Sequence, residues 1–258
     1  EYLQVLLAQA FDHIGEYGLA IELAFDALKT EHDYRDAWVI LGHAFLNQQR
    51  PADSEDAFTR ALALDADSNI SLFFRGMARA QIGKLQDAVA DFNQALEKGY
   101  KPRINVQYQL AQSYFNLGDS QKAFSYYQEI VIADPSDIKR FVRPIALAIN
   151  QLNKPEEALN LAKNGLETHP NDAQAETLLG WALLANNNLA ESREHLEKAL
   201  AINPQLASGY LNRGQLQERI GARQQALDDY RKAIELAQLQ HEISIEETAQ
   251  QRYNTLEK

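Results

Sequence analysis

The 258-residue chain contains no cysteine, so it can form no disulfide bond, no thiolate metal site and no thiol nucleophile. Positive charge is also scarce, because 25 Lys and Arg residues stand against 36 Asp and Glu residues and give a net charge of −11. This deficit argues against nucleic acid and anionic membrane surfaces as partners. No apolar run approaches the roughly 18 residues that a membrane-spanning helix needs. We therefore expect no nucleic acid partner and no direct membrane insertion.

Motifs of catalysis and cofactor binding are absent as well. The six histidines show no H-E-x-x-H spacing, and the chain has no G-x-G-x-x-G, G-x-x-x-x-G-K-[ST] or G-x-S-x-G sequence. We therefore expect no catalytic residues, no metal site and no cofactor, and predict that the chain is not an enzyme. The compartment stays open, since a soluble protein of the cytoplasm or of the periplasm fits this composition equally well.

A repeat of 34 or 35 residues is the main feature that the sequence does contain. Residues 38–45 read WVILGHAF, a W-x2-L-G-x2-aromatic pattern. Glycines recur 34 residues apart, and small residues recur throughout the chain on the same spacing, at Ala20, Ser54, Ala88, Ala123, Ala158, Ser192 and Ala226. Small side chains at regular intervals suit places where two helices approach closely. This pattern resembles the tetratricopeptide repeat (TPR).

The resemblance implies an all-α fold, a right-handed α-solenoid of stacked antiparallel helix pairs. It divides the chain into seven repeats and a C-terminal capping helix over 241–258; the repeats are 1–34, 35–68, 69–102, 104–137, 139–172, 173–206 and 207–240. Within each unit, apolar residues at i, i+3, i+4 and i+7 independently predict two amphipathic helices. Because the first repeat has no cap before it, we expect the natural protein to continue upstream.

Residues that tolerate a left-handed backbone mark the turn inside most repeats, at Gly15, Gly83, Gly118, Asn153, Asn187 and Gly221. After the last repeat, Ser244 and Glu247 form a capping-box pattern that predicts a helix start at Ser244. One side of that helix carries Ile245, Ala249, Tyr253 and Leu256, and we expect this side to cover the last repeat. Pro144, inside an expected helix, predicts irregular curvature around the fourth and fifth repeats.

In the family that the chain resembles, the first helix of each pair lines a concave groove. Carrying over its inward positions predicts a groove with no net charge. The groove is rich in side-chain amides: Gln9, Asn47, Gln81, Asn105, Gln109, Gln112, Asn116, Asn150, Gln151, Gln174, Asn212 and Gln215. Amides both donate and accept hydrogen bonds, which suits an extended peptide. The candidate ligand-binding residues are Val39, His43, Phe73, Met77, Tyr108, Gln112, Arg140, Arg143, Thr177, Trp181 and Gln215.

Each candidate has an alternative interpretation. The aromatic residues can pack between neighbouring repeats instead of contacting a ligand, and His43 is more typical of a hydrogen-bonding contact than of a metal ligand. Arg140 and Arg143 could bind a ligand carboxylate. Alternatively, they could be a solvated pair that balances the negative charge of Asp137 and nearby acidic residues. The residue set that clamps chaperone C-termini in some relatives is replaced here, by Val5, Gln9, Ile40, Ile70 and Phe74. A chaperone-tail cofactor is therefore not expected.

The leading hypothesis is a non-catalytic scaffold that binds a protein or peptide partner in this neutral, amide-rich and aromatic groove. The alternative is a repeat scaffold within a larger bacterial envelope assembly or exopolysaccharide secretion protein, in contact with glycan. A homodimer through the terminal repeats is a further possibility, because Leu3, Leu6, Leu7 and Phe11 are apolar residues of the uncapped first repeat.

Overall fold

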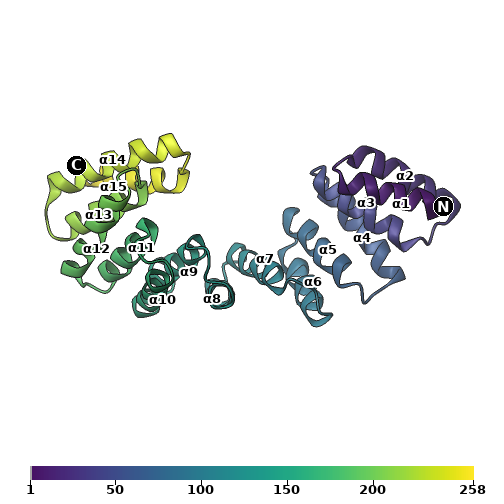
Figure 1. Cartoon of the computed structure of the whole chain (residues 1–258), viewed down its shortest axis with the longest axis horizontal. Coiled ribbons are helices and arrows are strands. Elements are labelled where there is room, and N and C mark those ends of the chain that lie inside the picture. The colour runs from purple at the N-terminus through teal and green to yellow at the C-terminus, as the bar shows by residue number, and fades with distance from the viewer. Residues whose placement is uncertain (1) are drawn as a thin grey trace. The chain divides into compact units, whose positions relative to one another are not determined.

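The computed structural model describes residues 2–258 and shows, within them, fifteen α-helices and no strand (Figure 1). The helices are α1 (Tyr2–His13), α2 (Tyr17–Thr30), α3 (Arg35–Asn47), α4 (Pro51–Leu64), α5 (Asn69–Gln81), α6 (Leu85–Glu97), α7 (Arg103–Asn116), α8 (Ser120–Ala133), α9 (Lys139–Asn150), α10 (Pro155–Thr168), α11 (Ala173–Ala185), α12 (Leu189–Ile202), α13 (Ala207–Arg219), α14 (Arg223–Gln240) and α15 (Ile243–Glu257). The all-α prediction is confirmed. Seven helix pairs and a final helix fit the expected ranges, and the number of repeats remains a prediction.

The turn inside every pair except α3–α4 has the left-handed backbone that the sequence predicts. All six Gly and Asn residues named for these turns have positive φ, from 52° at Asn153 to 84° at Gly15. The turn between α3 and α4 has the same conformation at Gln49, with φ 62°. Glutamine is not enriched in the left-handed region, so the sequence gives no sign of this turn conformation.

Close contact inside each pair depends on the regularly spaced small residues, all seven of which are fully buried. The Ser54 hydroxyl donates a hydrogen bond to the Gly42 carbonyl at 2.7 Å, and Ser192 donates to Gly180 in the same way at 2.8 Å. These bonds satisfy two buried hydroxyls where the helices come together. Side chains larger than Ala or Ser at these positions would force the two helices of a pair apart.

The described chain forms two compact units, residues 2–126 and residues 127–258. In the first unit α3 contacts α1 and α5, and α5 contacts α7; in the second, α11 contacts α9 and α13. By contrast, α2 and α4 make no such contact, and neither do α12 and α14. In each unit the first helices of the pairs therefore line the more tightly packed side, which we call the inner face.

The C-terminal helix α15 packs on α14, as expected of a cap. Ala249 is fully buried, and Ile245, Tyr253 and Leu256 pack against the same cluster as Tyr230. The predicted start of this helix is wrong, because α15 begins at Ile243 with Glu242 as its N-cap residue and Ser244 lies inside the first turn. None of the helices in residues 2–258 combines the length and apolar character needed to cross a bilayer.

Candidate functional site

The inner face of the first unit presents most of the residues that the sequence nominated there. Val39 and His43 on α3, Met77 on α5 and Gln112 on α7 are half-buried, and Tyr108 on α7 is 45% exposed. The Gln112 side-chain amide donates to the Tyr108 hydroxyl at 3.2 Å. This face therefore offers apolar surface, an aromatic ring and an amide without a carboxylate or lysine among these residues.

The His43 ring is held in place by contacts to two other helices, α1 and α5. Its Nδ1 lies 2.8 Å from Oδ2 of Asp12 on α1, its ring meets the Phe74 ring edge-on at 5.3 Å, and its carbonyl accepts a 2.9 Å bond from Asn47. Asp12 is 9% exposed, so the imidazole provides a polar partner for a nearly buried carboxylate. His43 thus makes a structural hydrogen bond at the edge of the candidate site.

Two nominated residues are covered by neighbouring elements and leave the candidate surface. Phe73 is 5% exposed, since its ring stacks on Tyr100 at 4.3 Å and tilts against Phe92 at 5.9 Å. Thr177 is fully buried where α11 approaches Gly209 of α13. Phe73 is covered by α6 of its own pair and by the loop that follows α6, whereas Thr177 faces α13, the first helix of the following pair. Neither side chain is therefore open to a ligand. Asn212, one of the amide-bearing residues, is also buried.

In the second unit the nominated residues are Arg140 and Arg143 on α9, Trp181 on α11 and Gln215 on α13. Arg143 is exposed, and the other three are half-buried. Arg140 donates to the Asp134 carbonyl at 2.9 Å and forms an ion pair with the Asp134 carboxylate. Hydrogen bonds from Arg140, and then from Ser136, lower the pKa of Asp134 to about 2. The intramolecular pairing of Arg140 therefore competes with any ligand carboxylate.

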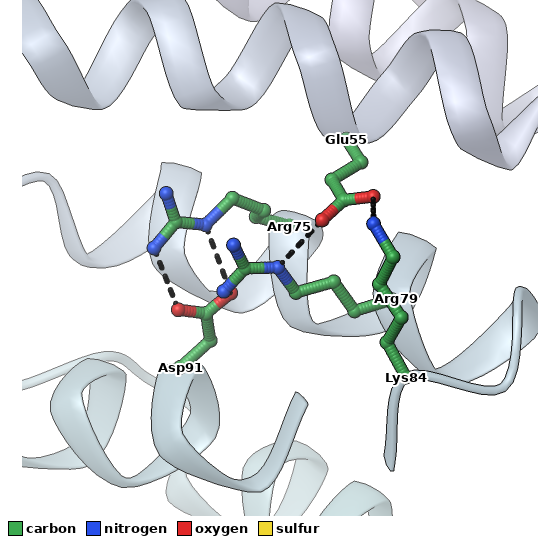
Figure 2. Close-up of polar contacts among 5 residues, drawn as sticks. All are labelled: Glu55, Arg75, Arg79, Lys84 and Asp91. Atoms are coloured by element: carbon green, nitrogen blue, oxygen red, sulfur yellow. Dashed lines mark hydrogen bonds and ion pairs between the residues drawn. The ribbon is translucent and has the colours of Figure 1, made fainter. Parts of the chain in front are cut away.

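A buried ionic network in the first unit was not nominated from the sequence (Figure 2). Asp91 of α6 is 2% exposed and accepts two bonds from Arg75 of α5, at 2.9 and 2.7 Å, and a third from Arg79 at 2.8 Å. Arg79 also bonds Glu55 of α4 at 3.0 Å, and Lys84 contacts the other Glu55 oxygen at 2.7 Å. The network joins α4, α5 and α6, and thus connects two successive helix pairs.

Burial raises the pKa of the Glu55 carboxyl, but hydrogen bonds from Lys84 and Arg79 outweigh burial and lower that pKa overall. Glu55 is therefore ionised at neutral pH and its interactions are those of a charged group. Because the bonds of this network lie between its own members, we assign it to the stability of the first unit and not to ligand binding.

The second unit repeats part of this arrangement. Arg213 of α13 forms two bonds with Asp229 of α14, at 2.8 and 2.6 Å. In the predicted repeat register Arg75 and Arg213 share position 7, and Asp91 and Asp229 share position 23. The other repeats carry apolar residues at position 7, so a comparison of these two positions alone could have revealed both pairs.

Another buried carboxylate, Glu176 of α11, connects to α12. It is fully buried, its Oε2 lies 2.6 Å from Nδ1 of His195, and its Oε1 lies 2.5 Å from Nζ of Lys198. Among residues 2–258, no group of three or more His, Asp or Glu side chains is placed to hold a metal ion. The histidines at 43 and 195 instead pair singly with carboxylates.

Comparison with known proteins agrees with the helical repeat described above. Family profiles described as tetratricopeptide repeat match residues 40–101 and 150–207, residues 105–137, and residues 207–238. Hsp70-Hsp90 organizing protein 1 of Glycine max is 24% identical over 192 residues, 69% of this chain and 32% of that protein. The mitochondrial import receptor subunit TOM70 of Homo sapiens is 23% identical over 228 residues, 81% of this chain and 35% of that protein. The chain thus spans about a third of the length of these relatives.

Solved structures share the fold. The C-terminal part of a TPR repeat-containing protein from Cytophaga hutchinsonii aligns with a TM-score of 0.72 and 14% identity, over 90% of this chain and 95% of that one. YrrB, described as a TPR protein with an unusual peptide-binding site, aligns with a TM-score of 0.58 and 19% identity, over 72% of this chain and 95% of that one. At such identities the likeness is one of fold.

Proposed function

The chain belongs to the tetratricopeptide repeat family, and on that premise we propose that it is a non-catalytic scaffold that binds a segment of a partner protein on its inner face. The observation that carries the proposal is the surface of α3, α5 and α7, where Val39, His43, Met77, Tyr108 and Gln112 are half-buried or exposed on neighbouring helices. An exposed tyrosine beside an amide and apolar side chains is typical of peptide-contacting surfaces.

Relatives support this class of function. The names of three of them refer to organising Hsp70 and Hsp90, to mitochondrial import and to peptide binding. We do not propose that this chain binds chaperone C-termini. Gln9, Ile40 and Phe74 occupy the positions at which a carboxylate clamp needs asparagine or basic residues. In the second unit, Arg143, Trp181 and Gln215 form the corresponding candidate surface.

The test compares what the tagged chain captures with what its inner-face variants capture, using quantitative mass spectrometry. We expect Tyr108→Ala and Trp181→Ala each to weaken capture of the same partner at least fivefold, as for interface anchors that contribute more than about 1 kcal/mol. Gln94→Ala on α6 and Glu194→Ala on α12 are matched controls, since both residues are exposed on the second helices of their pairs. Equal loss in the controls, or no loss with either aromatic variant, would contradict the proposal.

Salt dependence provides a second measurement. Because the nominated residues of the first unit include no lysine, arginine or carboxylate, we expect binding there to change less than about threefold between 50 and 500 mM salt. A steep loss of affinity over this range would indicate an ionic surface elsewhere on the chain. The Arg143→Glu variant would then show whether α9 supplies that charge.

A further inference from the structure

A separate pocket lies between the second helices of the first two pairs, away from the candidate inner-face residues. Its volume is about 560 Å³, within the range of pockets that hold small ligands or anchor side chains. The lining comes from the C-terminal halves of α2 and α4, the loop between α2 and α3, and one side chain of α3; it consists of Phe25, Leu28, Lys29, His32, Asp33, Trp38, Arg60, Ala63 and Leu64. We call it the α2–α4 pocket.

The apolar walls of this pocket are fixed in position yet partly open to solvent. The Trp38 indole N–H donates to the His32 carbonyl at 3.0 Å, and the Phe25 ring tilts against Phe45 at 6.3 Å. Phe25 and Leu64 nevertheless remain 42% and 41% exposed. A large apolar side chain that entered here would gain contact with two aromatic rings without requiring the pocket to form first.

The charged residues of the pocket favour an acidic partner. The Arg60 guanidinium carbon lies 4.8 Å from the centre of the Trp38 ring, and no carboxylate of residues 2–258 forms an ion pair with Arg60. Lys29 pairs with Asp26 at 2.7 Å, but this contact is exposed and therefore weak. The lining thus carries two basic side chains against one acidic side chain, Asp33, in a chain with a net charge of −11.

We propose that the α2–α4 pocket binds an aromatic side chain of a partner protein that is flanked by acidic residues. The aromatic ring packs against Trp38 and Phe25, because pairs of aromatic rings attract one another beyond the effect of area burial alone. A neighbouring carboxylate forms an ion pair with Arg60, whose guanidinium can donate two parallel hydrogen bonds to such a group. This contact is separate from the inner face and would give the partner a second point of attachment.

The experiment uses three capped peptides: Ac-EEFEE-NH2, Ac-EEAEE-NH2 and Ac-KKFKK-NH2. The chain has two tryptophans, so Trp181→Phe leaves Trp38 as the single fluorescent reporter beside the pocket. We expect Ac-EEFEE-NH2 to change the Trp38 emission saturably, and the alanine and lysine peptides to bind at least tenfold more weakly. Equal binding of the lysine peptide, or no saturable change with Ac-EEFEE-NH2 up to millimolar concentration, overturns the proposal.

A matched pair of variants separates the pocket from general charge. Arg60→Gln should weaken binding of Ac-EEFEE-NH2 at least fivefold. Arg50→Gln removes an arginine in the same unit that also lies over an aromatic ring, 4.3 Å from the centre of Phe45, but outside the pocket lining. Both arginines are exposed, so both variants should keep the wild-type far-UV circular dichroism and Tm. If the two variants weaken binding equally, the pocket is not the site.

Discussion

At the scale of single residues, glycine sets the distance between the helices of a pair. A Cβ atom added to Gly76 of α5 would lie 2.6 Å from Cε1 of Phe92, which is fully buried on α6. We expect Gly76→Ala to lower the free energy of unfolding of the first unit by about 1–3 kcal/mol, the usual cost of overpacking. Urea unfolding followed by Trp38 fluorescence in the Trp181→Phe background measures this loss.

The control is another glycine inside a helix. A Cβ on Gly18 of α2 would meet no atom within 4 Å, and this glycine has no positive φ. Gly18→Ala should therefore stabilise the same unit by roughly 0.5–1 kcal/mol, because alanine favours the helix over glycine. If both substitutions changed stability in the same direction, close packing at Gly76 would not be the cause.

Asp91 is the most deeply buried member of the network shown in Figure 2. Asp91→Asn would keep the size of the side chain but remove the charge that both Arg75 and Arg79 contact. We expect a loss of roughly 3 kcal/mol in the free energy of unfolding, since removal of one partner leaves buried charge without compensation. Thermal and urea unfolding of the first unit measure it.

An exposed ion pair in the same unit is the comparison for Asp91. Asp53 pairs with Arg50 at 2.7 Å, and both side chains are 49% exposed. Asp53→Asn should change stability by no more than about 0.5 kcal/mol. A loss as large as that of Asp91→Asn would mean that burial does not decide the strength of these pairs.

At the scale of helices, one carboxylate couples α11 to α12 in a pH-dependent way. Burial raises the pKa of Glu176, but hydrogen bonds from Lys198 and then His195 outweigh it, so the pKa is lower than its ordinary value of 4.5. The unfolded chain therefore takes up this proton more readily than the folded chain. The contribution of Glu176 to stability is complete above about pH 5 and is lost as pH falls through the lower, folded pKa.

Trp181 in a Trp38→Phe background reports on this helix pair. We expect the urea midpoint of the second unit to fall between pH 7 and pH 3.5, and to fall less in Glu176→Gln, which has no proton to take up at this position. Glu194→Gln, an exposed residue of the same helix as His195, should retain the full acid dependence. An unchanged pH dependence in Glu176→Gln would exclude Glu176 as a source of acid sensitivity.

The helices themselves could be predicted because apolar spacing and turn residues agree along the chain. Where that agreement is missing, prediction fails: Gln49 adopts positive φ without a Gly or Asn, and α15 begins at Ile243 although Ser244 and Glu247 match a capping box. The candidate site was harder to predict. The position of Phe73 within its repeat does not show that Tyr100 covers it. Tyr100 lies near the end of the repeat, in the loop after α6, and the predicted inward-facing positions lie only within the first helix of each pair.

At the scale of the whole molecule, the exposed apolar side of α1 bears on association. Leu3 is 67% exposed and Leu6 and Leu7 are each 43% exposed, whereas Phe11 packs partly into the core. We expect light scattering to show a mass that rises with protein concentration, and the double variant Leu3→Lys, Leu7→Lys to remain monomeric. Ile132→Lys, which changes a side chain that is 78% exposed on α8, should associate like the wild type. A constant monomer mass for the wild type would exclude association through α1.

The ion pairs also determine where the chain could be divided or recombined. Arg75–Asp91 and Arg213–Asp229 each lie within one helix pair and would move with it, but Glu55 bonds across the junction between α4 and α5. If the chain were divided within residues 65–68, the buried Glu55 carboxylate would be separated from its partners Arg79 and Lys84. Across the junction between α12 and α13, the hydrogen bonds that Ser208 donates to Gln174 and Arg219 donates to Asn187 are long, at 3.4 and 3.5 Å. Residues 203–206 are therefore the better place for an inserted domain or a circular permutation.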